Sequence, residues 1–573
     1  MKLKNLTKEM RKLWDDAHDF DPNDPMVGLT GKDLSGPKLS RRTTLRLLAA
    51  GGTLTAAHLV PGFSTMAHAE GAAGGTLNCG WAGVAEIQTL DPAKIGQVLQ
   101  FQITSNVLSG LMHIDASLVA QGDLAENWTV SDDGLEYTFK LREGVTFHNG
   151  DPFNADDVMY TFERSSNPDI SIHSKNLANV EKLEKLGDYE VKFTLKQPQA
   201  SFLTKTLERA SGRAMTIVSK GALEQMGDAQ YGLTPVGTGP FKFSEWQRGQ
   251  HIHLVAFEDY YREGQPGLTE IWYQIIPDAA SRSVAIETGS VQLAQWGDIE
   301  TFDVARLAAM PGLEMTTKGY EFYSPVLWYE VNLRKAPFND LRFRKAMMHL
   351  LDKDFIVERI MFGLAAPATG PVASTTKYYD PEIPQYDFDV DAANAILDEM
   401  GMTRGENGIR TTIRFLVAPY GEIWTRLAEY FRQAMSAGGI EVILDSTDVA
   451  GWGTSVANWD YEVSTNMIFQ YGDPALGVSR SYVSSNIRKG VLFTNTQGYE
   501  NPEVDRLFTE ASQETDDARR QELYTQLQTI LAEELPVLWM TEQRYATIYS
   551  DQLKDLIVSA NGVNANFARA HFA

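Results

Sequence analysis

Several features that mark other classes of protein are scarce or missing in this 573-residue chain. The single cysteine, Cys79, cannot form an internal disulfide, which excludes a cysteine-rich metal or redox site. No window approaches the roughly 18 uninterrupted apolar residues that a membrane-spanning helix needs. The patterns His-Glu-x-x-His and Gly-x-Ser-x-Gly are also absent, and no other catalytic constellation stands out. We therefore expect no enzyme activity, no cofactor and no metal site.

Basic residues are few, and the formal net charge is −24. The first 69 residues contain 10 Lys and Arg against 7 Asp and Glu, whereas the rest of the chain contains 41 against 68. So acidic a body repels phosphate backbones and anionic membrane surfaces, which argues against nucleic acid as a partner. The length exceeds what one hydrophobic core supports, so we expect two or three domains.

The N-terminal region has the order of features found in an export signal. Arg41 and Arg42 form a twin-arginine pattern, a mildly apolar run follows, and Ala67 and Ala69 supply the small residues of a cleavage site. We interpret residues 1–69 as a lead-in plus a signal peptide read by the twin-arginine (Tat) translocase, which predicts a periplasmic protein. Because this route also carries folded enzymes, an exported enzyme remains an alternative.

Predicted strands and helices follow one another in mixed order, which indicates an α/β protein. Arg410–Ala418 and Ile440–Leu444 are expected strands, joined by a helix over 421–437 with apolar residues on one stripe. A strand–helix–strand unit makes its strands parallel, and ligands bind beyond the carboxyl ends of such strands. Tyr420 occupies that position here.

Local patterns predict further elements. A strand ending at Val130, a turn closed by Gly134 and an alternating strand to Leu141 form a hairpin, and Asn154 is placed to cap a helix. A second helix is expected to run from Asp340 to about Met361. Further along, Asn501 is expected to cap a helix that has Pro502 at its first position.

Two residue types invite a functional interpretation but favour a structural one. Cys79 fits a lipidation site poorly because Asn78 precedes it, and a buried strand residue is the better interpretation. His251 and His253 alternate on a predicted strand, and a solvated strand face is favoured over metal binding. The Gly/Pro-rich segment Pro235–Phe241 is interpreted as a turn and not as a phosphate loop, because Pro240 removes a backbone donor.

Seven segments, in this order, resemble the bacterial extracellular solute-binding proteins of family 5, the peptide/nickel type. The resemblance covers roughly residues 75 to 550. The segments are Asp123–Trp128, Ser131–Val145, Phe147–Gly150, Val236–Phe241, Pro337–Asp340, Arg342–Ala346 and Tyr471–Pro474.

The resemblance implies a two-lobed periplasmic-binding-protein fold of type II, of the large cluster with an extra subdomain in lobe I. Two chain crossings form the hinge, near Glu314–Phe322 and Glu534–Met540. The implied divisions are 75–322 and 540–573 for lobe I, 116–234 for its extra subdomain, and 323–539 for lobe II.

In function, the resemblance implies the substrate-binding component of an ABC importer, which captures a peptide-like or other small polar solute by lobe closure without chemistry. Its partners would be the ligand and the membrane permease and ATPase subunits, and we expect a monomer. A chemoreceptor-type binding protein for a sugar, an opine or a metal chelate is the other alternative.

Two charged positions that hold a peptide's ends in peptide-binding family members correspond here to Ala418 and Gln470. Both charges are missing, which disfavours a free dipeptide, because losing a buried ion-pair partner costs about 3–5 kcal/mol. For Asp473, a turn cap is favoured over binding a cation, and for Trp424 packing is favoured over stacking on a ligand. The ligand-binding candidates are Gln97, Trp296, Tyr323, Tyr420, Trp424, Trp452, Gln470, Tyr471 and Asp473.

Overall fold

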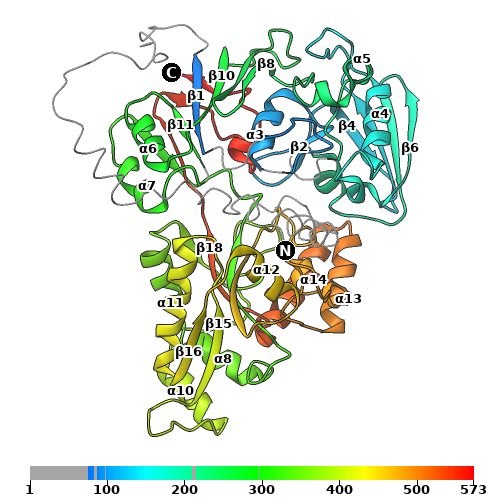
Figure 1. Cartoon of the computed structure of the whole chain (residues 1–573). Coiled ribbons are helices and arrows are strands. Elements are labelled where there is room, and N and C mark those ends of the chain that lie inside the picture. The colour runs from blue at the N-terminus through cyan, green and yellow to red at the C-terminus, as the bar shows by residue number, and fades with distance from the viewer. Residues whose placement is uncertain (1–74, 83–86, 97, 209–213, 296) are drawn as a thin grey trace, which may run out of the picture.

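The computed structural model describes residues 75–82, 87–96, 98–208, 214–295 and 297–573, and it shows two lobes (Figure 1). Among these residues, no helix has the length and apolar character needed to cross a membrane. Several predicted positions lie outside the described residues, namely Gln97, Trp296, Arg41, Arg42, Ala67 and Ala69.

Lobe I is built on a seven-stranded sheet with the strand order β12-β19-β11-β1-β10-β9-β8. Its central strand β1 pairs in parallel with β10 and β11, whereas β9 runs antiparallel to β10. Cys79 lies buried in β1, as predicted, and burial raises the pKa of its thiol. The strands of this sheet are β1 (Thr76–Trp81), β8 (Phe241–Gln247), β9 (His251–Ala256), β10 (Glu270–Ile275), β11 (Leu293–Ala294), β12 (Leu313–Thr316) and β19 (Thr547–Ser550).

Helices and two small sheets complete this part of lobe I. The longer helices are α3 (Val98–Val107), α5 (Lys220–Tyr231), α6 (Ala279–Glu287) and α7 (Thr301–Ala308). Short elements are β2 (Met112–Ile114), β3 (Ala120–Gly122), β20 (Leu553–Lys554), β21 (His571–Phe572), η1 (Ser174–Leu177), η2 (Leu203–Leu207) and η6 (Gly562–Asn564).

A four-stranded antiparallel sheet with the order β4-β5-β7-β6 lies inside the range predicted for the extra subdomain. Tyr137, Phe139 and Leu141 of β5 point into the core while the residues between them do not, so the predicted alternation is confirmed. Gly134 closes the hairpin turn with φ +68°, and Asn154 caps the helix in a capping box with Asp157. The elements are β4 (Ala125–Val130), β5 (Glu136–Leu141), β6 (Val180–Gly187), β7 (Glu190–Leu195) and α4 (Ala155–Ser166).

The Gly/Pro-rich segment packs against backbone, which confirms its interpretation as a turn. A Cβ atom at Gly237 would lie 2.0 Å from the carbonyl oxygen of Val107, and one at Gly239 would also meet backbone, so no side chain fits at either position. His148 joins both glycines: its Nδ1 accepts from the Gly237 N–H at 3.3 Å, and its Nε2 donates to the Gly239 carbonyl at 2.9 Å. Burial lowers the pKa of His148 to about 4 and keeps the ring neutral.

Lobe II contains a six-stranded sheet with the order β14-β18-β13-β17-β15-β16. The predicted strand–helix–strand unit is confirmed, because β15 and β16 are parallel and α11 connects them. The strands are β13 (Val326–Val331), β14 (Ala365–Pro367), β15 (Thr411–Leu416), β16 (Ile440–Asp445), β17 (Val463–Ile468) and β18 (Leu538–Gln543). Its longer helices are α8 (Leu341–His349), α10 (Val390–Glu399), α11 (Glu422–Ala437), α12 (Val449–Ala457), α13 (Pro502–Gln513) and α14 (Asp517–Glu534), and the short ones are η4 (Ser479–Ser481) and η5 (Ser484–Asn486).

The helix expected from Asp340 to Met361 is interrupted, so that prediction was wrong in its length. Asp340 caps α8 as expected, but α8 ends at His349. Asp352 then accepts a hydrogen bond from the Phe355 N–H and starts a new turn, α9 (Lys353–Phe355), which continues as η3 (Ile356–Ile360). A competing N-cap inside an apolar stripe therefore ends one helix and begins another.

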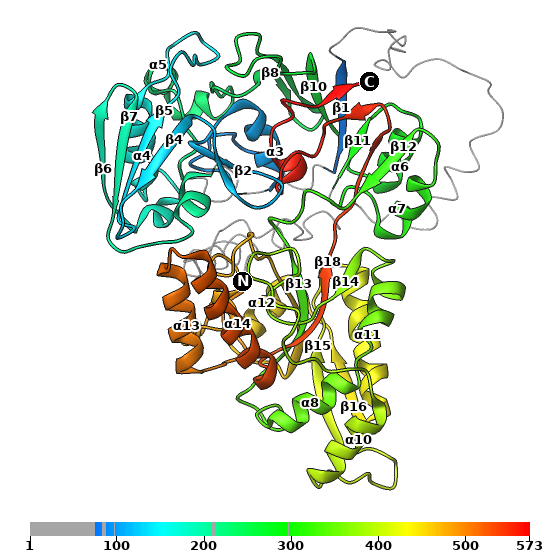
Figure 2. The ribbon, with the colours of Figure 1, turned by 180° about the vertical axis from the view of Figure 1, so that it is seen from behind.

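Two short chain connections join the sheets of the two lobes. The first runs from β12 to β13 over residues 317–325, close to the predicted crossing. The second is only three residues long, 544–546, between β18 of lobe II and β19 of lobe I, and Figure 2 shows this part of the chain rising from one lobe into the other. It lies later than the expected Glu534–Met540, because β18 is a buried inner strand without the alternation that would mark it as part of the lobe II sheet.

Candidate ligand-binding site

A cavity of about 510 Å³ lies between the lobes, and both lobes and the second connection line it. Lobe I contributes one short segment, 297–304, at the start of α7, whereas lobe II contributes side chains from several elements. The connection supplies Arg544, Tyr545 and Ala546. Cavities of a few hundred Å³ between rigid units are typical sites for small molecules.

Tyr420 is part of the lobe II wall and lies beyond the carboxyl end of β15, where the sequence predicts a ligand. Its ring makes edge contacts with Trp424, at 5.6 Å between centroids, and with Trp452, at 5.3 Å. Trp424 also lines the cavity. Trp452 does not, because it is buried behind Tyr420 and donates from Nε1 to the Ser464 hydroxyl at 3.0 Å. Trp424, beside Tyr420 on the cavity wall, and the buried Trp452 thus hold the Tyr420 ring in place.

Three other predicted residues lie one layer deeper. The Gln470 side chain is buried, accepts from the Ala373 N–H at 2.9 Å and donates to the Pro371 carbonyl at 2.7 Å. Tyr323 and Tyr471 are buried as well, and both rings pack against Phe469, which lines the cavity. These residues support the wall, and their direct contact with a ligand stays a prediction.

The Asp473 carboxylate forms an ion pair with an arginine of the same lobe. Its two carboxylate oxygens accept from the Arg520 guanidinium at 2.9 and 3.0 Å, and one of them also accepts from the Ala475 N–H at 2.9 Å. Both charged side chains are buried. The expected turn cap is confirmed, and Arg520, on α14, is a partner that the sequence does not reveal because it lies 47 residues away.

Two exposed phenylalanines face the cavity from opposite lobes, and sequence reasoning missed both. Phe302 of α7 is 64% exposed and Phe362, after η3, is 40% exposed. Phe362 has φ +52°, a conformation that costs a non-glycine residue energy and often marks a functional position. Neither residue belongs to a periodic pattern, so the only available indication was the bulky apolar side chain itself.

Among the described residues, four charged ones line the cavity, and two of them form a pair. Arg426 bonds to Glu422 one helical turn away, at 2.6 Å. Glu300 and Arg544 are exposed and have no ion-pair or side-chain hydrogen-bond partner within the described parts of the chain. Burial raises the pKa of Glu542 and the positive charge of Arg544 lowers it, but these two described side chains form no hydrogen bond. The Glu542 carboxylate instead accepts hydrogen bonds from the backbone N–H and the hydroxyl group of Ser374.

Asp298 lies directly behind the lobe I wall, between Gly297 and Ile299, which line the cavity. Its carboxylate is buried and accepts from the Ala82 N–H at 2.8 Å. Burial raises the pKa of Asp298 to about 7, although the Ala82 hydrogen bond and the charge of Arg282 lower it. This carboxyl group therefore titrates near neutral pH.

The histidines of β9 lie outside this cavity. His253 stacks on Trp272 with 3.9 Å between ring centroids and lies 3.1 Å from a carboxylate oxygen of Glu270. The face is half-buried and aromatic, which differs from the solvated face that the sequence suggests, because Trp272 on the neighbouring strand covers it. In the described part of the chain, no three His, Cys, Asp or Glu side chains are grouped to hold a metal ion.

Comparisons with known proteins agree on one family. The family model described as "Bacterial extracellular solute-binding proteins, family 5 Middle" matches residues 120–489. Glutathione-binding protein GsiB of Pectobacterium atrosepticum is 27% identical over 484 residues, covering 82% of this chain and 89% of the relative.

Solved structures share the fold. HbpA2 from Haemophilus parasuis aligns with a TM-score of 0.77 at 24% identity, over 87% of this chain and all of that one. DppA of Helicobacter pylori, an ABC transporter-associated periplasmic binding protein in complex with the peptide STSA, aligns with a TM-score of 0.68 at 23% identity, over 87% and 98% of the two chains. These likenesses confirm the two-lobed α/β fold, and the relatives' names favour solute binding over the exported-enzyme alternative.

Proposed function

Because the chain belongs to family 5 of the bacterial extracellular solute-binding proteins, we propose that it captures a peptide-like solute in the cavity between its lobes and delivers it unaltered to an ABC importer. The observation that carries the proposal is the composition of the cavity wall, to which both lobes and the second connection contribute. A ligand that touches both lobes binds their closed arrangement better than an open one and so shifts the population toward it.

The aromatic wall supports a ligand with an apolar part. Tyr420, Trp424, Phe302 and Phe362 offer flat apolar surface, and burial of such surface drives binding of small organic molecules. Glutathione is the first solute to test, because it is the ligand named for the GsiB relatives. Export by the Tat translocase, a periplasmic location, a monomeric state and a cognate permease and ATPase belong to the same proposal.

Protein purified from its native periplasm is analysed by native mass spectrometry, and we expect one small molecule retained at a 1:1 ratio. Isothermal titration calorimetry with that molecule, and with glutathione, then measures affinity. Tyr420→Ala removes one of the aromatic rings of the wall and should weaken binding at least about tenfold, as expected for an aromatic anchor.

Ile443→Ala is the matched control, because Ile443 is exposed on β16 away from the cavity. Its affinity should equal that of the unmodified protein. Chemical conversion of the retained molecule would overturn the proposal, as would equal affinities of Tyr420→Ala and Ile443→Ala.

A further inference from the structure

Among the described residues that line the cavity, one cation and one anion have no salt bridge, and they come from different parts of the molecule. Arg544 belongs to the three-residue connection, and Glu300 precedes α7 of lobe I. Each carries a long exposed side chain without a salt bridge or side-chain hydrogen bond in the described chain, whereas the cavity's other two charges, Arg426 and Glu422, neutralise each other. A ligand therefore meets two charged groups that are free to bond to it.

The apolar surface has a matching arrangement. Phe302 lies two residues after Glu300 on lobe I, and Phe362 lies on lobe II, where its ring is 5.7 Å from the Arg426 guanidinium. Both rings are far more exposed than the phenylalanines of the cores. Apolar groups this exposed at a cavity rim are usually covered by a ligand or by closure of the site.

From this arrangement, and on the basis of the proposed function, we infer that the site takes a zwitterionic peptide with an apolar side chain. Arg544 binds the terminal carboxylate, Glu300 binds the terminal ammonium group, and Phe302 and Phe362 enclose the apolar side chain. A guanidinium suits a carboxylate because it donates two parallel hydrogen bonds. The two charges take the roles that are missing at Ala418 and Gln470, neither of which lines this cavity, so the peptide's ends are recognised from other positions.

The test uses glycyl-phenylalanyl-alanine, its N-acetyl form and its C-terminal amide as calorimetric probes. Arg544→Met removes the guanidinium at similar length, and Glu300→Gln removes the carboxylate charge. Each loss of a charge-assisted contact should weaken the free tripeptide roughly tenfold or more. Arg544→Met should leave the affinity of the amide unchanged, and Glu300→Gln should leave that of the acetylated peptide unchanged.

Arg506→Met and Glu503→Gln are the matched controls, because they remove the same charge types from an exposed pair on α13 that does not line the cavity. They should bind all three probes within about twofold of the unmodified protein, as expected for an exposed pair. The melting temperatures of the four ligand-free variants should agree, since all four side chains are exposed.

Equal sensitivity of the free and amidated peptides to Arg544→Met would overturn the assignment, as would an unchanged affinity of Glu300→Gln for the free peptide. Failure of the unmodified protein to bind any of the three peptides, with another solute retained from the periplasm, would overturn this inference and leave the proposed capture function intact. If the protein binds none of the three peptides and also retains no solute from the periplasm, the proposed function is overturned as well.

Discussion

The two lobes bury their apolar residues in different ways. Lobe I contains several separate hydrophobic clusters, one under the seven-stranded sheet, one in the subdomain of β4–β7 and one around α6 and α7. Lobe II has one large cluster, which extends across the boundary to Ile114 and Leu118 of the β2–β3 hairpin. Lobe II is therefore a single packed frame that supplies most of the cavity wall, whereas lobe I is assembled from several smaller packed units.

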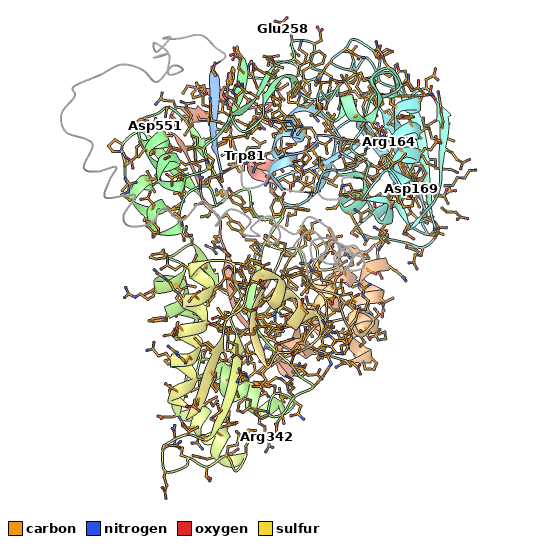
Figure 3. The ribbon with its side chains drawn as sticks, viewed as in Figure 1. Trp81, Arg164, Asp169, Glu258, Arg342 and Asp551 are labelled. Carbon is orange, nitrogen blue, oxygen red and sulfur yellow. The ribbon has the colours of Figure 1, made fainter. Side chains whose placement is uncertain are left out.

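In the described part of the chain, each lobe contains one arginine–aspartate pair in which both side chains are buried, and the two pairs hold different parts together. Arg520–Asp473 ties α14 to the loop after β17 inside the single cluster of lobe II. Arg164–Asp91 joins α4 of the subdomain to the segment after β1, and Figure 3 shows Arg164 within the subdomain. The first pair fixes a loop behind the binding wall, and the second fixes one unit of lobe I onto another.

The largest difference between the lobes should appear when these pairs are broken. Arg520→Met leaves Asp473 buried without a cation and should lower the free energy of unfolding by about 3–5 kcal/mol. Arg164→Met should cost less, about 2–3 kcal/mol, because Lys94 lies 3.4 Å from the Asp91 carboxylate and compensates in part.

Urea denaturation followed by tryptophan fluorescence measures both changes. Arg342→Met is the control, since Arg342 lies at the end of lobe II farthest from lobe I (Figure 3) and its pair with Asp340 is exposed. It should change stability by less than about 0.5 kcal/mol. Equal losses for Arg520→Met and Arg164→Met would contradict the comparison.

The next largest difference should be in the pH dependence of stability, to which lobe I contributes through Asp298. Burial raises the pKa of Asp298 from 3.8 in the unfolded chain to about 7 in the folded one. Its contribution to stability is fully present below pH 3.8 and is lost as the pH rises through 7. Between pH 5 and 8 the protein should lose about 2–3 kcal/mol through this group.

Asp298→Asn keeps an oxygen for the Ala82 N–H and cannot ionise, so it should flatten this part of the pH profile. The measurement is the denaturation midpoint of both proteins at pH 5, 6.5 and 8. Parallel profiles for the variant and the unmodified protein would show that Asp298 does not titrate in this window.

The smallest expected difference concerns helix caps. Asn154 of lobe I and Asn501 of lobe II each accept backbone N–H groups at a helix start, but Asn501 also donates to the Glu534 carboxylate at 3.1 Å. Asn154→Ala should cost about 1 kcal/mol, and Asn501→Ala should cost more, up to about 2 kcal/mol.

Asn154→Ser and Asn501→Ser serve as controls, since serine retains the cap. Serine should restore the stability almost completely at position 154 and only in part at position 501, because its short side chain cannot reach Glu534. Thermal denaturation resolves these shifts, and full restoration at both positions would remove the difference between the lobes.

What the sequence predicts well is local. The hairpin around Gly134, the caps at Asn154 and Asn501 and the parallel unit that places Tyr420 depend on periodicity and on contacts between near neighbours. The sequence placed the second connection too early in the chain, because the inner strand β18 is buried on both faces and shows no alternation.

The cavity itself depends on long-range placement. Arg544 and Glu300 are ordinary exposed charges in the sequence, and only the fold brings them to one cavity. Arg520 likewise finds Asp473 across 47 residues. Such pairings follow from the tertiary arrangement, and local patterns of residue types do not predict them.

The brevity of the 544–546 connection has a mechanical consequence. With so few rotatable backbone bonds between β18 and β19, any change in the angle between the lobes concentrates in these torsions. Arg544 is one of the three residues, so the same rotations that swing the lobes also reorient its guanidinium. Position 544 thus combines a place in the connection with the proposed contact to the ligand carboxylate, and a spectroscopic label at neighbouring Tyr545 would report the angle between the lobes and ligand binding together.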